Sequence, residues 1–322
     1  MKKTIKRFFL KSTWVIDIII SPFVACSAFV LKFIRRVGIK KFPISKKVLL
    51  NIGVFPIREH YYEPIFNSKH LKKSLSDERV LSGIDWNVNG QLALLKAFNF
   101  QHEFTNISDK FVSDTIFHFR NGAYESGDAE YWYNIIRLKK PKRIIEIGSG
   151  NSTKMARLAI DMNKKLDPNY QCRHICIEPY EMPWLEKIGV EVLREKVENI
   201  DISFFRQLEA DDILFIDSSH MIRPQGDVLT EYLELIPTLK SGVIVHIHDV
   251  FSPRDYPKEW VVDEVRFWNE QYLLEAFLSC NSEWKIIGAL NFLKHNHFEL
   301  LKETCPRLTP DREPGSFYII KS

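Results

Sequence analysis

The chain has 322 residues, enough for one large domain with extensions or for two small domains. Hydrophobic residues make up 45% and charged residues 27%, and a net charge of +4 is too small to indicate nucleic-acid binding. The five cysteines, namely Cys26, Cys172, Cys176, Cys280 and Cys305, show no CxxC spacing. They indicate neither a disulfide framework nor a structural zinc site, and a reducing cytoplasm is the simplest interpretation.

An apolar stretch near the N-terminus, Trp14 to Leu31, contains only Asp17, two serines and Pro22 as interruptions. Cations flank it on both sides: Lys2, Lys3, Lys6, Arg7 and Lys11 before it, and Lys32, Arg35, Arg36, Lys40 and Lys41 after it. A helix rising about 1.5 Å per residue would barely cross a hydrocarbon core of roughly 30 Å. Equal charge at both ends gives no orientation by the positive-inside rule.

We therefore predict that residues 1–41 contact the cell membrane at its cytoplasmic face. The predicted helix lies on the membrane, or re-enters it with a bend at Ser21-Pro22. A single span, a cleaved signal peptide and a buried core helix are the alternatives. The flanking cations argue against a core helix.

Residues 45–125 show few regular periods, with one short helix predicted at Gln91–Phe98. We expect a cap rather than a domain with its own core. From about residue 126 the pattern changes to alternating helices and short apolar strands, which indicates a parallel sheet. The predicted domains are thus a basic, apolar segment at 1–44, a cap at 45–125 and an α/β domain at 126–322.

Seven strands are predicted, at 143–147, 173–177, 190–194, 212–216, 242–247, 284–289 and 316–320. Predicted helices lie at 152–164, 181–187, 225–238 and 259–279, and another runs from an Asp128 N-cap to Arg137. The fold class is α/β, a doubly wound and mostly parallel seven-stranded sheet. An antiparallel final pair fits the last two strands, which only a loop-rich segment separates.

The first strand ends in Glu146-x-Gly148-x-Gly150, and a helix opens at once. Glycines in such a turn let a ligand approach the backbone, and the first N–H groups of the helix face that ligand. The dinucleotide fingerprint G-x-G-x-x-G needs a third glycine, which is missing because Asn151, Ser152 and Thr153 follow. The turn predicts a nucleotide-like ligand without identifying it.

Ionisable residues follow the next strands at the same edge of the sheet. Glu178 ends the second strand, where a carboxylate binds both hydroxyls of a ribose. Asp217 and His220 follow the fourth strand, and His248 and Asp249 end the fifth. Such a concentration of titratable groups on one rim suggests catalysis.

At this point the chain resembles the class I S-adenosylmethionine-dependent methyltransferases, over about Asp128 to Lys321. The closest resemblance is to a bacterial branch with Asp-x-x-His after strand four and His-Asp after strand five. It implies a Rossmann-like methyltransferase domain that binds S-adenosylmethionine. The cofactor-binding residues that it implies are Glu146, Gly148, Ser149, Gly150, Ser152, Glu178 and Asp217.

The resemblance also implies O-methylation of a sugar or another hydroxylated small molecule, in envelope polysaccharide or natural-product biosynthesis. His248, Asp217 and His220 are the predicted catalytic residues. Both histidines are candidate general bases because imidazole titrates near neutral pH. His248 is favoured because the fifth strand commonly points at the acceptor in this family. His246 lies deeper on the same face and is expected only to orient His248. Asp217, His248 and Asp249 also form a candidate site for Mg²⁺ or Mn²⁺.

Two other functions fit parts of the pattern. An NAD-type oxidoreductase uses the same turn and ribose carboxylate but needs the third glycine. A non-catalytic, membrane-tethered scaffold of methyltransferase fold would not need its rim residues. The sequence specifies neither the acceptor nor the oligomeric state.

Overall fold

The computed structural model describes residues 13–322, so the cations Lys2, Lys3, Lys6, Arg7 and Lys11 lie outside the described residues. By its internal contacts the chain divides into two compact units, Met1–Lys72 and Lys73–Ser322. We call them the N-terminal unit and the sheet unit. The division falls at neither of the boundaries expected after residues 44 and 125, and it places 73–125 with the sheet.

The N-terminal unit consists of helix α2 (Thr13–Val37), a 3₁₀ turn at Ile39–Lys41, helix α3 (Pro43–Ile52) and a second 3₁₀ turn at Ser68–His70. Helix α2 continues through Pro22 and has 25 residues, about 37 Å at 1.5 Å per residue. Among the described residues it is the helix long and apolar enough to cross a membrane. No part of its apolar stretch is buried, whereas a core helix would be mostly buried. A signal sequence near the N-terminus can have the same length and apolar composition.

The sheet unit contains a seven-stranded sheet of order β3-β2-β1-β4-β5-β7-β6. Its strands are β1 (Arg143–Ile147), β2 (Arg173–Ile177), β3 (Glu191–Leu193), β4 (Ile213–Ile216), β5 (Ile244–Ile247), β6 (Trp284–Ala289) and β7 (Phe317–Lys321). The first five are parallel, while β7 runs antiparallel to both β5 and β6. The predicted doubly wound, mostly parallel sheet with an antiparallel final pair is therefore confirmed.

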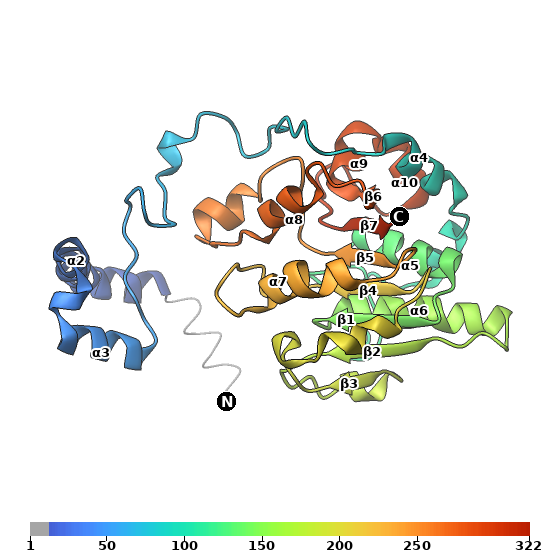
Figure 1. Ribbon diagram of the computed structural model, residues 1–322, viewed down its shortest axis with the longest axis horizontal. Helices are drawn as coiled ribbons and strands as arrows, with labels where there is room; N and C mark the ends of the chain where they lie inside the picture. Colours follow the sequence, from blue (N-terminus) through green and yellow to red (C-terminus); the bar gives the residue numbers. More distant parts are fainter. Residues whose placement is uncertain (1–12) are drawn as a thin grey trace. The chain divides into compact units, whose positions relative to one another are not determined.

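Helices cover both faces of this sheet because each buried strand has apolar residues on both sides (Figure 1). The helices of the sheet unit are α4 (Val88–Ala97), α5 (Asp128–Lys139), α6 (Asn151–Leu166), α7 (Asp227–Leu229), α8 (Glu270–Leu278), α9 (Leu290–Asn296) and α10 (Phe298–Thr304). One core joins α5 and α6 to Ile144 and Phe215, and the other joins α8 to Ile145 and Ile216. Helices α5 and α6 pack against each other.

The segment 73–125 contributes to these cores. Leu95, Phe104 and Phe117 are at most 1% exposed and belong to the core on the α5–α6 face. The short helix expected at Gln91–Phe98 is present as α4 and packs against β6 and α10. This part of the expected cap is therefore packed into the sheet unit and contributes to its core.

Several predicted helices differ from those observed. Only a 3₁₀ turn at Leu185–Lys187 occupies 181–187, where Pro183 disfavours a helical residue before it. The helix expected at 225–238 starts as α7, widens into a π-helix at Thr230–Leu235 and ends in a 3₁₀ turn at Ile236–Thr238.

The helix expected at 259–279 is divided into a π-helical stretch at Glu259–Asp263 and the later α8, because Val265 adopts a left-handed φ of 57°. The loop-rich segment expected between the last two strands instead contains α9 and α10.

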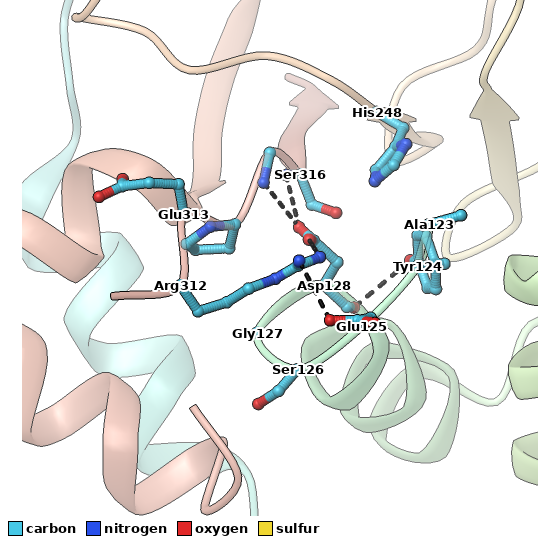
Figure 2. A network of polar contacts seen from close by, with 12 residues as sticks. Ala123, Tyr124, Glu125, Ser126, Gly127, Asp128, His248, Arg312, Glu313 and Ser316 are labelled. Atoms are coloured by element: carbon cyan, nitrogen blue, oxygen red, sulfur yellow. Dashed lines mark hydrogen bonds and ion pairs between the residues drawn. The ribbon is translucent and has the colours of Figure 1, made fainter. Parts of the chain in front are cut away.

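Asp128 links the start of α5 to the loop before β7 (Figure 2). Gly127 occupies the N-cap position, so the predicted Asp128 cap is wrong by one residue. The Asp128 carboxylate instead accepts hydrogen bonds from the backbone N–H groups of Gly315 (2.9 Å) and Ser316 (2.8 Å). Since the Val250 N–H donates to the Gly315 carbonyl at 2.7 Å, this loop supports the end of β5.

We predict that Asp128→Ala lowers the free energy of unfolding by about 3 kcal/mol, because it leaves two buried N–H groups without acceptors. Urea denaturation measures the change. Asp161→Ala is the matched control, since its carboxylate is 62% exposed beside Arg157 and its removal costs less than about 0.5 kcal/mol. Equal effects of the two substitutions would contradict the role given to Asp128.

Candidate active site

The turn after β1 depends on one of its two glycines for its shape. Gly148 has a left-handed φ of 82°, and a Cβ there would lie 2.1 Å from the backbone oxygen of Asp217. Gly150 is different, because its φ of 179° suits any residue and open space surrounds its Cβ position. The first glycine thus lets β1 and β4 approach each other, and the second leaves room beside the backbone.

Thr153 stands where a dinucleotide-binding turn has its third glycine. Its hydroxyl donates to Glu146 at 2.5 Å and accepts from the Gly150 N–H at 3.0 Å. His174 Nε2 lies 3.1 Å from the other Glu146 oxygen, and both side chains are wholly buried. Glu146 therefore supports the turn from below, while its expected contact with a ligand ammonium remains a prediction.

A cavity of about 360 Å³ opens at the carboxyl ends of β1, β2 and β4. Glu178 lines it and accepts hydrogen bonds from the N–H groups of Ser149 (3.2 Å) and Tyr180 (2.9 Å). Gly148 and Asp217 line it as well. Strands β2 and β3 lie on one side of β1, and β4 and β5 lie on the other, so the strand order reverses between β1 and β4. The cavity lies at this switch point, where doubly wound sheets bind ligands.

Sequence reasoning missed other residues that line this cavity: Lys196, Val197, Glu198, Ser218, Ser219, Arg223 and Asp227. They follow β3 and β4, so the carboxyl ends of those strands were the available signal. Ser152, predicted to bind the cofactor, is buried, and its carbonyl accepts a hydrogen bond from the Trp132 indole at 3.2 Å.

The rim residues after β4 and β5 converge as expected. His248 Nδ1 lies 3.6 Å from an Asp217 oxygen and 3.5 Å from an Asp249 oxygen. The donor atoms of Asp217, His248 and Asp249 all lie within 4.8 Å of one another. His248 Nδ1 is buried without a hydrogen-bond partner in the described part of the chain. Two carboxylates and an imidazole in this arrangement fit a divalent cation such as Mg²⁺ or Mn²⁺.

His220 occupies the other side of Asp217. Its Nε2 lies 3.3 Å from Asp217, and its Nδ1 hydrogen-bonds Glu270 at 2.7 Å. Glu270 also accepts from the Tyr232 hydroxyl at 3.0 Å. No local signal pointed to Glu270 as a site residue, because it lies in a stretch expected to be one continuous helix.

The electrostatics of the rim favour protonated histidines. Burial alone would lower the pKa of His220, but its hydrogen bonds to Asp217 and Glu270 raise it well above its usual value. Burial is likewise outweighed at His248, where the charges of Asp249 and Asp217 raise the pKa to about 9. Without a metal, neither imidazole is a ready general base at neutral pH.

The two aspartates differ in proton affinity. Burial would raise the pKa of Asp217, but the charges of His248 and His220 hold it well below its usual value. Burial raises the pKa of Asp249, against the opposing charge of His248. Asp217 is thus the permanent anion of the rim.

The backbone at the rim is strained. Both His220 and Asp249 have a left-handed φ of 58°. Non-glycine residues in that region cluster at functional sites, because the surrounding structure must hold them there.

Other expected site residues are engaged elsewhere. His246 is wholly buried, hydrogen-bonds Ser316 at 2.9 Å and stacks on Tyr318. Burial, followed by the charge of His248, lowers the pKa of His246 well below its usual value. Arg254, a cation in the loop after β5, is also engaged, by the Ser76 carbonyl and Glu78.

Four aromatic side chains, each of a type that can stack on a sugar ring, divide between packed and exposed positions. Trp132 is wholly buried, and Trp86 stacks on Phe292. Tyr61 and Tyr62 are exposed in the N-terminal unit. Core packing thus accounts for Trp132 and Trp86.

Comparison with known proteins identifies the domain. A family model described as "Methyltransferase domain" matches residues 145–250. An uncharacterized protein of Archaeoglobus fulgidus is 31% identical over 164 residues, which cover 47% of this chain and 72% of that protein.

Solved structures that resemble this chain include three methyltransferases. CalS11, a TDP-rhamnose 3'-O-methyltransferase of calicheamicin biosynthesis, has 14% identity and a TM-score of 0.33, over 60% of this chain and 76% of that one. A Bacillus cereus O-methyltransferase in complex with SAH has 10% identity and a TM-score of 0.32, over 73% and 91%. MycE of mycinamycin biosynthesis, with Mg and SAH, has 15% identity and a TM-score of 0.32, over 60% and 48%. Likenesses this distant carry no argument about the chemistry of this chain.

We predict that Gly148→Ala lowers the free energy of unfolding by about 2–4 kcal/mol, because its Cβ meets the backbone of Asp217 and its φ becomes strained. Gly150→Ala is the matched control and costs less than about 1 kcal/mol, since open space surrounds the added methyl. Chemical denaturation measures both. A tolerated Gly148→Ala would contradict the close approach of β1 to Asp217.

We predict that His248 titrates with a pKa of about 9 in metal-free protein, as followed by histidine NMR. Because its pKa is raised on folding, protonated His248 stabilises the protein below about pH 6.5, and that contribution is lost as the pH rises through 9. Asp217→Asn lowers the midpoint by removing one of the two charges. A midpoint at or below 6.5 in the unsubstituted protein would contradict the effect assigned to the charges of Asp249 and Asp217.

Proposed function

We propose that this chain is an S-adenosylmethionine-dependent O-methyltransferase of a hydroxylated small molecule or sugar. The chain carries a methyltransferase domain and belongs to one family with the Archaeoglobus fulgidus protein. One observation carries this proposal. The cavity at the switch point of the sheet shares Asp217 with the cluster of Asp217, His248 and Asp249. A nucleoside site and a candidate acceptor site thus meet at one carboxylate.

The cofactor side of the site fits the nucleoside part of S-adenosylmethionine. Glu178 lines the cavity at the end of β2, and each of its two oxygens accepts one backbone N–H. These bonds orient the carboxylate, which can then accept ribose hydroxyls. Space beside Gly150 allows the amino-acid end to approach the backbone. Asp217 then lies nearest the methyl group, which the cofactor supplies.

The acceptor side is formed by the rim residues. Bound by Asp217, His248 and Asp249, a divalent cation would stabilise the deprotonated acceptor oxygen. The cluster then orients that oxygen for in-line transfer. His220, held between Asp217 and Glu270, fixes the Asp217 carboxylate. In this arrangement His248 binds the cation rather than the acceptor proton.

An NAD-type oxidoreductase is the rival function, and Thr153 argues against it. The third glycine of a dinucleotide turn permits close packing of helix and strand. Here that position bears a side chain that hydrogen-bonds both Glu146 and Gly150. A scaffold without activity would leave the strained rim unexplained.

We further propose that α2 attaches the chain to a membrane, and that the active domain faces the cytoplasm. The support is the exposed apolar surface of α2, on which Trp14, Phe23 and Phe29 are each at least 67% exposed. An acceptor in envelope polysaccharide or natural-product biosynthesis fits an enzyme attached in this way. Incubation of membranes with methyl-labelled S-adenosylmethionine, followed by glycan and lipid analysis, identifies the acceptor.

We predict that S-adenosylhomocysteine binds the chain and that Glu178→Gln weakens binding at least about tenfold, because a charge-assisted hydrogen bond is worth roughly 1.5–3 kcal/mol. Isothermal titration measures the affinity. Glu209→Gln, which alters an exposed carboxylate beside Lys240, is the control and leaves it unchanged. Binding of NAD in place of S-adenosylhomocysteine would support the oxidoreductase instead.

We predict that Mn²⁺ binds more tightly as the pH rises toward 9, because His248 must lose its proton to bind a metal. Asp249→Asn weakens this binding at least about tenfold, whereas Asp161→Asn does not. Titration calorimetry in two buffers detects the released proton. Methyl transfer that persists in EDTA would remove the metal from the proposal.

A further inference from the structure

The end of α2 and the start of α3 are held together inside the N-terminal unit. Gly38, with a left-handed φ of 109°, ends α2 and allows the chain to change direction. The rings of Phe33 and Phe42 then meet edge to face, with centroids 6.1 Å apart. Helix α3 is therefore placed at the C-terminal end of α2 rather than along its apolar middle.

The segment after α3 returns to the same end of α2. Arg35 forms an ion pair with Glu63, and its guanidinium lies 5.1 Å from the centre of the Phe55 ring. Contacts on both sides of α3 thus fix its level relative to α2. If α2 enters a membrane, α3 lies at the depth of the last turn of α2, which carries Arg35 and Arg36.

Helix α3 presents an apolar face that no described residue covers. Ile44, Val48 and Ile52 recur every fourth position and are 80%, 50% and 68% exposed. Three such side chains on a helix of ten residues are unusual for a surface that meets only water. This is the pattern of a helix that lies in the plane of a membrane interface.

The charges around α3 specify the kind of membrane. Helix α3 contains the exposed cations Lys46 and Lys47 and no acidic residue, and the turn before it adds the exposed Lys40 and Lys41. When an apolar face inserts into a membrane, neighbouring cations bind the negative headgroups of anionic lipids.

We propose that α3 is an in-plane helix whose face of Ile44, Val48 and Ile52 inserts into the headgroup region of an anionic bilayer. This inference rests on the membrane attachment by α2 proposed above. It assigns a lipid contact to residues beyond the apolar N-terminal helix. It also implies that the access of the enzyme to a membrane-bound acceptor depends on the content of anionic lipid.

The test places a bimane label on single cysteines in the full chain, with Cys26, Cys172 and Cys280 replaced by serine. The chain is reconstituted in phosphatidylglycerol vesicles containing nitroxide-labelled lipid, which quenches labels in the bilayer. Labels at Ile44→Cys and Ile52→Cys are quenched about twice as strongly as the control label, because an in-plane helix sits roughly 5–10 Å deep. Leu50→Cys is the control, since Leu50 is 56% exposed but lies about 160° around the helix from Ile52.

Lipid charge supplies the second arm. Phosphatidylcholine vesicles, or the pair Lys46→Glu and Lys47→Glu, reduce quenching at position 44 to the level at position 50. Lys69→Glu with Lys72→Glu, also exposed in the N-terminal unit, has no effect. Equal quenching at 44, 50 and 52 would overturn the in-plane helix, and equal quenching in both lipids would overturn its anionic preference.

Carbonate extraction separates this inference from the proposals on which it rests. A chain released from the membrane by carbonate would overturn both the attachment by α2 and the inference about α3. A retained chain whose α3 labels are shielded from water but not quenched by lipid would overturn the inference alone, because a protein surface then covers the face. Binding of S-adenosylhomocysteine is independent of each of these results.

Discussion

The close approach of Gly148 to the backbone of Asp217 is the constraint on which the site depends. It occurs because β1 and β4 are neighbours at the switch point of the sheet, and because Gly148 has no Cβ to keep them apart. The cofactor turn after β1 and the acidic rim after β4 therefore share one edge. Any side chain at position 148 would separate the two parts, whereas Gly150 contributes space and not closeness.

Charge balance organises the rest of the rim. Asp217 stays ionised between two histidines, while Glu270 and Asp249 provide the outer carboxylates. Buried ions of one sign need partners of the other, so the protons on His220 and His248 offset the aspartates when no metal is bound. A divalent cation can replace the proton on His248, whose donor atom lies in the cluster with Asp217 and Asp249, while His220 Nδ1 stays hydrogen-bonded to Glu270. The two histidines thus have different roles, although the sequence presents them alike.

The sequence predicts elements with a strong local signal and misses those set by tertiary contacts. The bounds of β1, β2 and β6 agree with prediction because each is a short segment in which isoleucine and other apolar residues predominate. The convergence of Asp217, His248 and Asp249 follows from strand ends that meet at one edge. The contact of Glu270 with His220 has no local signal, since 50 residues separate the two in sequence. The break at Val265 was also not predicted, because a β-branched residue rarely adopts a left-handed φ. The contacts of Glu146 with Thr153 and His174 were likewise not predicted, and its contact with a ligand stays a prediction.

One carboxylate, Asp217, is proposed to belong both to a nucleoside site and to a cation site. The decisive measurement is a crystal structure with S-adenosylhomocysteine and Mn²⁺, recorded at the manganese absorption edge. We expect the ribose on Glu178, the sulfur facing Asp217, and one anomalous peak among Asp217, His248 and Asp249. A nucleoside bound away from Glu178, or a peak confined to other residues, would contradict it.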